Sequence, residues 1–550
     1  MIDLGLEFRT NLKNLYINKQ FSQIEDEIES LKNLEDLPTE IKMLYAVSKS
    51  LNPKSIKKDF IIASYFFEKV FITNKLNLEP FYNLILSSVK GVFFDYLEPH
   101  LKEQYVKNNK DPKILEGLAK MSTCYANMTD ASFYYTELIK IKPNYVNAWV
   151  GLLASFNYHE NIDQIQYLNY CRRFDELPNQ ELKIIRRKNL QDKIKVGFFS
   201  TDLKIHSVSF FLKNVISKIN KNQFELHALS NLEINKHDEM THDMKGIFDS
   251  WNDTLDLTDS EFIKLTRDLN LDILIDLSGY FAGNRIQAFR ARCAPIQISW
   301  LGYCNSLGIK NMDYLISDKN LILKNELDQY SEKILYMPNT WSTISLPRNL
   351  GQIIIKPNEK ERIFTYGSFN NFQKISENTI NVWSKILNNS NSKLILKNST
   401  GENLKRLNDI ILNKFIKKQV DIKKITILPP TLTREDHLDC YNQIDLALDT
   451  FPYPGVTTTF ESILMGVPVL TKKGFNFNSR CGESINHNIG LDEFIAENEE
   501  DYFDKALTIQ KKKKLLKELK LTMRDKFLKS DKYDPIKFTE DFSNLLKSLL

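Results

Sequence analysis

The spacing of apolar residues changes near residue 193, and this change limits the folds that the chain can adopt. Before it, apolar side chains recur at helical spacing, and we find no convincing strand. After it, short β-rich runs alternate with helical segments. Strands that alternate with helices predict parallel, doubly wound sheets. The predicted strands are Lys195–Ser200, Leu271–Leu277, Pro295–Trp300, Phe364–Phe369, Lys393–Lys397, Ile425–Leu428, Leu446–Asp449 and Val467–Thr471.

The alternation breaks once, in a stretch with proline and asparagine between Asn339 and Glu359 that we interpret as a linker. We therefore predict a helical region over residues 1–190, followed by two Rossmann-like α/β domains over 191–345 and 346–534. The amphipathic tail, 535–550, is predicted to cross back onto the first of these domains. Two such domains in tandem place a cleft between two sets of strand carboxyl ends, where open α/β sheets bind ligands.

Part of the helical region carries a repeat-like pattern. The segment Cys124–Phe156 is typical of a helix, a turn at Pro143 and a second helix, and it resembles a degenerate tetratricopeptide unit. The earlier helices, predicted over Asn14–Leu31 and Lys57–Ile72, are either further worn repeats or parts of an irregular helical domain. Oligomers through this helical region are possible.

Composition excludes several classes of protein. The net charge of +4 comes from 74 basic and 70 acidic residues, a balance that argues against a dedicated nucleic-acid binder. The first residues lack the pattern of a secretory signal. The most apolar stretch, 81–97, is interrupted by polar residues and cannot span a bilayer. Six scattered cysteines without a C-x-x-C pair predict neither zinc nor disulfides, and a cytoplasmic location fits best.

The most informative stretch covers residues 445–470. A buried strand is predicted to end at Asp449, a turn with prolines and a glycine follows, and a helix opens at Thr457. Free N–H groups and the positive end of a helix dipole suit a diphosphate. Glu461, predicted in the first helical turn, is placed to accept hydrogen bonds from ribose hydroxyls. The competing interpretation is a capping box of Thr458 and Glu461, which needs no ligand.

Ordered motifs extend through both predicted α/β domains. They are Val196–Asp202 with His206, Asp272–Tyr280, Ala294–Tyr303, Met312–Asp318, Gln329–Lys333, Gly367–Lys374, Arg434–His437 and Asp449–Pro468. In this order they resemble the catalytic region of the O-linked N-acetylglucosaminyltransferase and SPINDLY family, which tetratricopeptide-like helices also precede. The resemblance implies a GT-B arrangement of the two domains and a glycosyltransferase that needs neither metal nor cofactor.

The resemblance assigns roles to several residues of the second domain. Lys374, where a predicted strand gives way to a helix, matches a lysine that binds the diphosphate. Asn371 lies where the family has a polar residue near the nucleotide. Arg434 and His437 match a basic residue and a histidine that hold the base and ribose. Without the resemblance, Lys374 would be interpreted as an ordinary surface lysine.

Two loops of the first domain are also candidates. His206 follows the first predicted strand, where it could orient the acceptor or take a proton from its hydroxyl. Without the family match, a loop histidine that only packs would be the simpler interpretation. The turn from Asn305 to Gly308 is expected to present backbone amides beside the donor sugar. The charge of the leaving group would be neutralised by Lys374 and by the helix start at Thr457 and Thr458.

The favoured reaction is inverting transfer of N-acetylglucosamine from UDP-N-acetylglucosamine to a Ser or Thr hydroxyl of a protein. Val456 and Gln373 stand where the animal enzymes have a histidine and a tyrosine, and the proline-rich turn is nearer the SPINDLY-like branch. The alternatives are therefore a GDP-fucose-dependent protein O-fucosyltransferase, an asparagine-directed glucosyltransferase and a surface-polysaccharide transferase. An inactive repeat scaffold is the alternative from another class, and the presence of Lys374, His206 and Glu461 argues against it.

Overall fold

The computed structural model describes residues 4–31, 33–179, 193–347, 349–355, 362–398 and 404–550. The chain divides into two compact units, Met1–Ala148 with Gly401–Leu407, and the remainder. The predicted boundary at residue 190 lies outside the described residues. Within the described ranges no helix is long and apolar enough to cross a membrane. All six cysteines are free.

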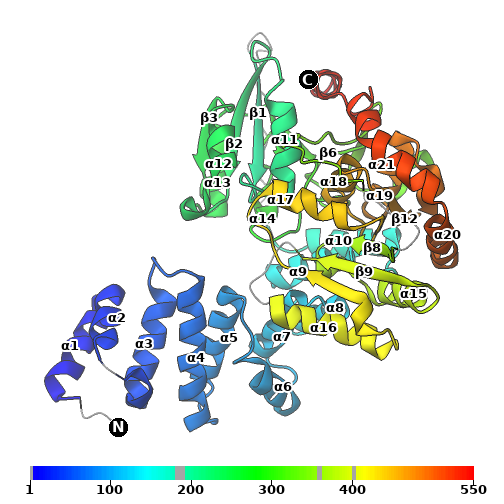
Figure 1. Ribbon diagram of the computed structural model, residues 1–550. Helices are drawn as coiled ribbons and strands as arrows, with labels where there is room; N and C mark the ends of the chain where they lie inside the picture. The colour runs from blue at the N-terminus through cyan, green and yellow to red at the C-terminus, as the bar shows by residue number, and fades with distance from the viewer. Residues whose placement is uncertain (1–3, 32, 180–192, 348, 356–361, 399–403) are drawn as a thin grey trace. The chain divides into compact units, whose positions relative to one another are not determined.

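The first unit is built from consecutive helices, drawn in blue in Figure 1, and its described residues contain no strand. Neighbouring helices pack on one another, α3 on α4, α4 on α5 and α7 on α8. The buried ammonium of Lys49 on α3 lies 2.9 Å from Glu25 of α2 and 3.2 Å from Asp59 of α4, so one cation ties three helices together. The helices are α1 (Leu6–Ile17), α2 (Phe21–Glu29), α3 (Thr39–Leu51), α4 (Lys57–Thr73), α5 (Glu79–Gly91), α6 (Glu98–Lys107), α7 (Pro112–Cys124) and α8 (Met128–Ile141).

The helix predicted over Asn14–Leu31 is wrong as a single element. Lys19 adopts a left-handed backbone with φ 55°, which separates α1 from α2. Each of the two helices still buries part of one face, Leu12 in α1 and Ile24 in α2. Helical spacing therefore persists on both sides of the break and conceals it in the sequence.

The second unit contains two fully parallel sheets with doubly wound strand orders, β3-β2-β1-β4-β5-β6-β7 and β10-β9-β8-β11-β12-β13. We refer to them as the first and second α/β domains. The strands of the first are β1 (Ile194–Ser200), β2 (Phe224–Ser230), β3 (Ser250–Asp253), β4 (Ile273–Asp276), β5 (Ile296–Ser299), β6 (Tyr314–Ser317) and β7 (Lys333–Tyr336). Those of the second are β8 (Phe364–Ser368), β9 (Ser392–Lys397), β10 (Ile425–Leu428), β11 (Leu446–Leu448), β12 (Val469–Lys472) and β13 (Ile495–Ala496).

All eight predicted strands are present within one or two residues of their expected ends. The sequence did not single out β2, β3, β6, β7 and β13. The helices of this unit are α9 (Val146–Phe156), α10 (Gln164–Asp175), α11 (Ser207–Ile216), α12 (Glu239–Lys245), α13 (Asp259–Asp268), α14 (Ile286–Ala291), α15 (Glu377–Asn388), α16 (Leu404–Lys417), α17 (Arg434–Asp439), α18 (Thr457–Leu464), α19 (Cys481–Ile489), α20 (Glu499–Lys511), α21 (Lys513–Leu528) and α22 (Pro535–Lys547). The unit boundary falls inside α9 and the Leu404–Lys417 helix.

Two buried side-chain amides join the α/β domains. Gln164, at the start of α10, donates to Asn305 of the first domain over 2.8 Å and accepts from Asn476 of the second over 3.1 Å. Asn157, just after α9, accepts a 3.0 Å hydrogen bond from Asn305, and its carbonyl accepts from Asn478. Gln164 therefore bonds to both domains through its side-chain amide, and Asn157 does so through its side-chain oxygen and its backbone carbonyl, all away from water.

Charged side chains add a second set of contacts between the domains. Arg480 forms a bidentate ion pair with Glu326, with N–O distances of 2.6 and 2.8 Å. The hydroxyl of Ser484 donates to the buried carboxylate of Asp318, 3.0 Å from its nearer oxygen. Burial raises the pKa of Asp318 to about 6, although hydrogen bonds to its carboxylate oppose the shift.

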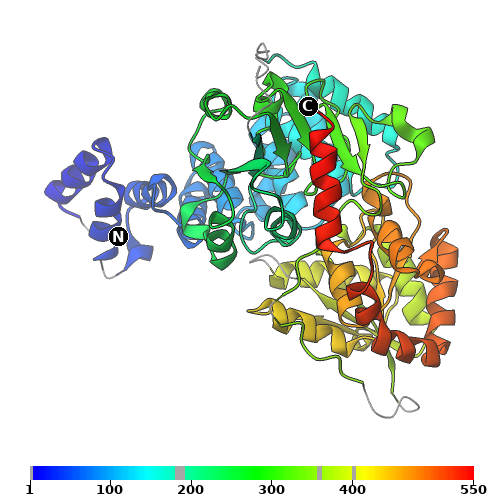
Figure 2. The same cartoon turned by 90° about the horizontal axis from the view of Figure 1, so that it is seen from above.

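The C-terminal helix returns to the first α/β domain. Figure 2 shows α22 in red beside the green strands, and it packs on α11. Phe542 is fully buried, with its ring centroid 4.7 Å from that of Trp300, which follows β5. The predicted tail, 535–550, thus does lie on this domain.

Removing the Phe542 ring should weaken the second unit. Phe542→Ala is expected to lower its free energy of unfolding by about 3–5 kcal/mol, since it deletes a buried aromatic side chain and leaves a cavity. Ile536→Ala, on the same helix but with 61% of its surface exposed, should change it by less than about 0.5 kcal/mol. Chemical denaturation followed by tryptophan fluorescence makes the comparison. Equal effects of the two variants would contradict the docking of α22.

Candidate functional site

Each sheet reverses its strand order once, between β1 and β4 in the first domain and between β8 and β11 in the second. Ligands of open α/β sheets bind at these points, outside the carboxyl ends of the strands. The loop after β1 leads to His206, the loop after β8 leads to Lys374, and the loop after β11 leads to Thr457. The topology thus places three predicted site residues at these two points.

Lys374 ends a short 3-10 turn, Phe372–Lys374, and lies over the proline-rich loop. Its ammonium donates to the carbonyl of Pro454 over 2.8 Å and lies 3.9 Å from the ring centroid of Tyr453. Burial lowers its pKa, and the charge of Asp449 partly opposes the shift. Within the described residues no carboxylate lies within ion-pair distance of the Lys374 ammonium. A bound anion would therefore contact a cation that has no direct counter-charge.

The side chain of Asp449 fixes the position of the proline-rich loop. This buried carboxylate accepts from the backbone N–H of Gly455 over 2.7 Å and from the side chains of Thr471 and Asn370. Burial raises its pKa. A side chain at Gly455 would collide with Thr458, because a Cβ there would lie 2.3 Å from its hydroxyl oxygen. The loop therefore reaches α18 through a turn with no room for a larger residue.

The start of α18 has no side-chain cap. Val456 occupies the N-cap position and Thr457 is the first helical residue. Thr458 donates instead to Asn370 over 2.5 Å, and Glu461 lies in the helix body facing α17. The capping-box interpretation of Thr458 and Glu461 is therefore wrong, and so is the placement of Glu461 in the first turn. Backbone N–H groups left without a side-chain acceptor remain suited to a phosphate.

A charged cluster joins α17, α18 and the end of β9. The buried carboxylate of Glu461 accepts from Arg434 Nε over 3.3 Å and lies 3.2 Å from His437 Nε2. The ammonium of Lys397 lies 2.8 Å from His437 Nδ1. Burial alone would raise the pKa of Glu461, but the hydrogen bonds and charges of His437 and Arg434 hold it below its ordinary value. Glu461 is thus a carboxylate whose position is fixed from two sides.

Lys397 is a site residue that the sequence analysis missed. It is the last residue of β9 and is 1% exposed. The sequence did offer a signal for this residue, because Lys397 ends an apolar run at the carboxyl edge of a predicted strand. It looked like an ordinary strand terminus because its partner, His437, is 40 residues away.

His206 caps α11 with its own ring. Nδ1 accepts from the backbone N–H of Val208 over 3.3 Å, and Asp202 lies 3.8 Å away. Partial burial lowers its pKa, while Asp202 opposes the shift. With Nδ1 as acceptor, the neutral ring carries its proton on Nε2. The ring therefore presents a donor, which suits orientation of an oxygen better than removal of a proton.

The predicted role of the Asn305–Gly308 turn disagrees with the structure. Its backbone N–H groups are already bonded within the protein, that of Leu307 to the buried carboxylate of Glu332 over 2.6 Å and that of Gly308 to Ser306 over 3.1 Å. A side chain at Gly308 would collide with Cys171 of α10, because a Cβ there would lie 2.2 Å from the cysteine Cβ. Asn305 and Gly308 therefore hold α10 against the first domain, and the amides are not turned toward a donor sugar.

Asn371 plays a local part next to Lys374. Its side chain accepts from the backbone N–H of Gln373 over 3.0 Å and so caps the short turn that ends in Lys374. A direct contact with the nucleotide stays a prediction.

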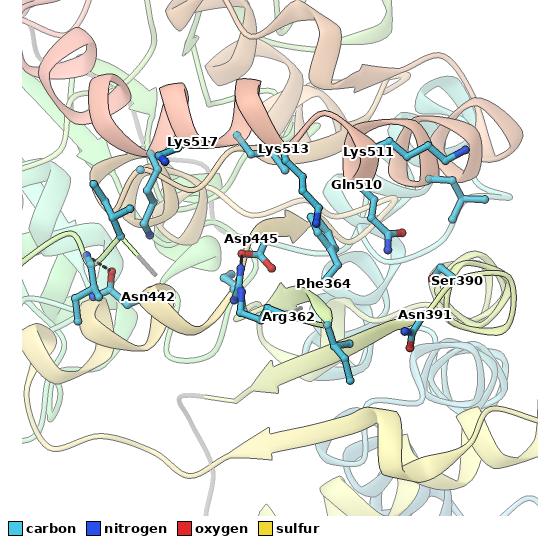
Figure 3. A pocket seen from close by; sticks show the side chains of 18 of the residues that line it. Arg362, Phe364, Ser390, Asn391, Asn442, Asp445, Gln510, Lys511, Lys513 and Lys517 are labelled. Carbon is cyan, nitrogen blue, oxygen red and sulfur yellow. Dashed lines mark hydrogen bonds and ion pairs between the residues drawn. The ribbon is translucent and has the colours of Figure 1, made fainter. Parts of the chain in front are cut away.

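Two of the cavities in the second unit are larger than 500 Å³. One, of about 940 Å³, is lined by Ile205 beside His206, by Phe210 of α11 and by Arg434, whose guanidinium lies 3.8 Å from the Phe210 ring centroid. This cavity lies between the two α/β domains, next to two predicted site residues, His206 of the first and Arg434 of the second. The other, of about 560 Å³, lies at the amino ends of the strands, with Arg362 before β8 and Asp445 before β11 (Figure 3). Doubly wound sheets bind ligands at the opposite edge, so the cavity of about 940 Å³ belongs to this site and the cavity of about 560 Å³ does not.

In the part of the chain that the structure describes, no group of three or more His, Cys, Asp and Glu side chains could hold a metal ion. The main features of the site are a half-buried lysine beside an uncapped helix start, and a fixed carboxylate one helical turn further along. The sequence model of glycosyl transferase family 41 matches residues 172–346 and 356–542, which include these features. The chain belongs to glycosyl transferase family 41.

Curated relatives and one solved structure agree with this membership. The SPINDLY proteins of Solanum lycopersicum and Arabidopsis thaliana, named as probable UDP-N-acetylglucosamine–peptide N-acetylglucosaminyltransferases, are each 28% identical over 75% and 70% of this chain. The chain spans less than half of their lengths, 45% and 43%. A mutant O-GlcNAc transferase of Thermobaculum terrenum has the same fold, with a TM-score of 0.82 and 24% identity over 93% of this chain and 98% of that one. The fold is therefore helical repeats followed by a GT-B pair, as predicted.

Substitution of Lys374 tests its assignment to the diphosphate. Lys374→Ala should weaken binding of a nucleoside diphosphate at least about tenfold, because a charge-assisted contact is lost. The unfolding midpoint of the protein without nucleotide should not fall, since the variant removes a half-buried cation that lacks a direct counter-charge. Lys385→Ala, at an exposed position on α15, is the control. Wild-type nucleotide affinity in Lys374→Ala, measured by calorimetry, would reject the assignment.

Proposed function

We propose that this chain is an inverting glycosyltransferase that moves N-acetylglucosamine from UDP-N-acetylglucosamine to Ser or Thr hydroxyls of a protein. The observation that carries the proposal is the pairing, at one edge of the second sheet, of a phosphate-binding half with a ribose-binding half. Lys374 and the uncapped start of α18 form the first, and Glu461 with Arg434 and His437 forms the second. The names of the relatives support the sugar and the peptide acceptor.

In the proposed reaction the acceptor oxygen attacks the anomeric carbon from the face opposite the diphosphate. The bond from that carbon to the β-phosphate oxygen breaks, negative charge develops on the departing nucleotide, and the proton of the acceptor hydroxyl passes to the departing phosphate or to water. Lys374 and the N–H groups at Thr457 and Thr458 stabilise that charge because they are already oriented toward it. His206 orients the acceptor hydroxyl or a donor oxygen through its Nε2–H group.

A second candidate, transfer of fucose from GDP-fucose, is favoured by one observation. Val456 supplies no polar side chain at the helix start, so sugar selection there would rest on backbone groups and on the threonines. The base then decides between the two reactions, and Arg434, whose Nη2 has no hydrogen-bond partner among the described residues, offers a donor that fits carbonyl oxygens of either base.

Thermal unfolding with different nucleotides separates these candidates. UDP and UDP-N-acetylglucosamine at 100 times their dissociation constants should stabilise the protein by about 2.7 kcal/mol, because a ligand that binds only the native state shifts unfolding by mass action. GDP and GDP-fucose should have little effect. Stabilisation by GDP and none by UDP would replace the proposal with the fucosyl reaction. No effect of any nucleotide would favour the inactive scaffold.

We also propose that transfer needs no metal, because Lys374 and the helix start supply the positive charge at the diphosphate. Transfer of sugar to a peptide acceptor, followed by mass spectrometry, should continue at an unchanged rate in excess EDTA. Loss of transfer on chelation, followed by recovery with manganese or magnesium, would contradict this part of the proposal.

A further inference from the structure

Lys397 is a buried cation that the reaction described above does not use. Within the described residues, no carboxylate lies within 4.0 Å of its ammonium, which contacts His437 Nδ1 at 2.8 Å and the Thr431 hydroxyl at 3.3 Å. Burial lowers its pKa. Burial of an ammonium in these surroundings costs free energy. An apolar residue would fill the same space without that cost, so we look for a further role of the lysine.

The contact with His437 fixes the tautomer of that ring. An ammonium can only donate hydrogen bonds, so His437 Nδ1 must accept, and the neutral ring carries its proton on Nε2. Nε2 lies 3.2 Å from one carboxylate oxygen of Glu461 and donates to it. Without Lys397, the ring could place its proton on Nδ1 and turn a lone pair toward the carboxylate.

Glu461 is left with acceptor capacity after these contacts. Its Oε1 accepts from Arg434 and its Oε2 accepts from His437, and an ionised carboxylate has about four lone-pair sites. Its side chain is 5% exposed, so few waters can occupy the remaining sites. Two free acceptor positions on one fixed carboxylate match the two adjacent hydroxyls of a ribose.

We propose that Lys397 is the positioning residue for recognition of the ribose diol. Through His437 it fixes the carboxylate of Glu461, which then accepts from the 2′- and 3′-hydroxyls. Lys397 itself need not touch the nucleotide. The inference deepens the proposed function and rests on it, since it requires that a nucleotide occupies this site.

The test is the affinity ratio between a nucleotide and its 2′,3′-dideoxy analogue. Calorimetry with UDP and 2′,3′-dideoxy-UDP, and with the GDP pair, should show a loss of about tenfold or more for the analogue of the base that the wild type binds. In Lys397→Met the analogue should bind less than about threefold more weakly than the nucleotide. Lys393→Met, on the same strand with an exposed side chain, should keep the wild-type ratio.

A second pair of variants separates the hydrogen bond from the charge. Lys397→Arg and Lys397→Gln both keep an N–H donor toward His437 Nδ1, so both should retain most of the wild-type ratio, and Lys397→Gln should do so without the charge. If Lys397→Met does not fold, these two variants still test the proposal. Loss in both of the affinity difference between the nucleotide and its dideoxy analogue would overturn it.

The outcomes distinguish the two levels of inference. If Lys397→Met binds both nucleotides more weakly by the same factor and so keeps the wild-type ratio, Lys397 has only a structural role and the inference fails. If the wild type binds neither UDP nor GDP, the proposed function itself fails.

Discussion

Two buried amides determine how the catalytic unit is assembled. Gln164 and Asn157 come from the helices that precede the first sheet, yet each bonds to residues of both α/β domains. A buried amide left without partners costs about 1–3 kcal/mol for each unsatisfied group, so these bonds favour one arrangement of the domains over others. The helix α10 and the end of α9 thus belong to the second unit as much as the sheets do.

That arrangement sets the distance between the two points at which the strand orders reverse. The ion pair of Arg480 with Glu326 and the bond from Ser484 to Asp318 keep the loops of the two domains together. Chemistry of the proposed kind depends on positioning and on oriented charge rather than on reactive side chains. A cleft fixed by buried polar contacts supplies that positioning before any substrate arrives.

The sequence predicted what depends on local pattern. Apolar runs identified eight strands, and the turn before Thr457 identified the start of α18, because burial and turn chemistry act over a few residues. Contacts between residues far apart in the sequence could not be predicted. Asn305 looked like a loop residue facing a ligand, but its partner Gln164 is 141 positions away. Short polar strands such as β3 (Ser250–Asp253) also escaped, since they exist only because the neighbouring strand β2 pairs with them.

Three buried or half-buried cations, Lys374, Lys397 and Arg434, surround the nucleotide site, and Glu461 is the one carboxylate among the described residues that pairs directly with any of them. The described residues thus supply a direct carboxylate partner to Arg434 alone, and in the proposed reaction the diphosphate of the donor would add negative charge beside Lys374. In the proposed reaction the nucleoside diphosphate gains negative charge as it leaves the sugar. In that reaction the cations that favour bond cleavage would hold the product more tightly than the donor, so release of the nucleotide, rather than the chemical step, would limit each turnover.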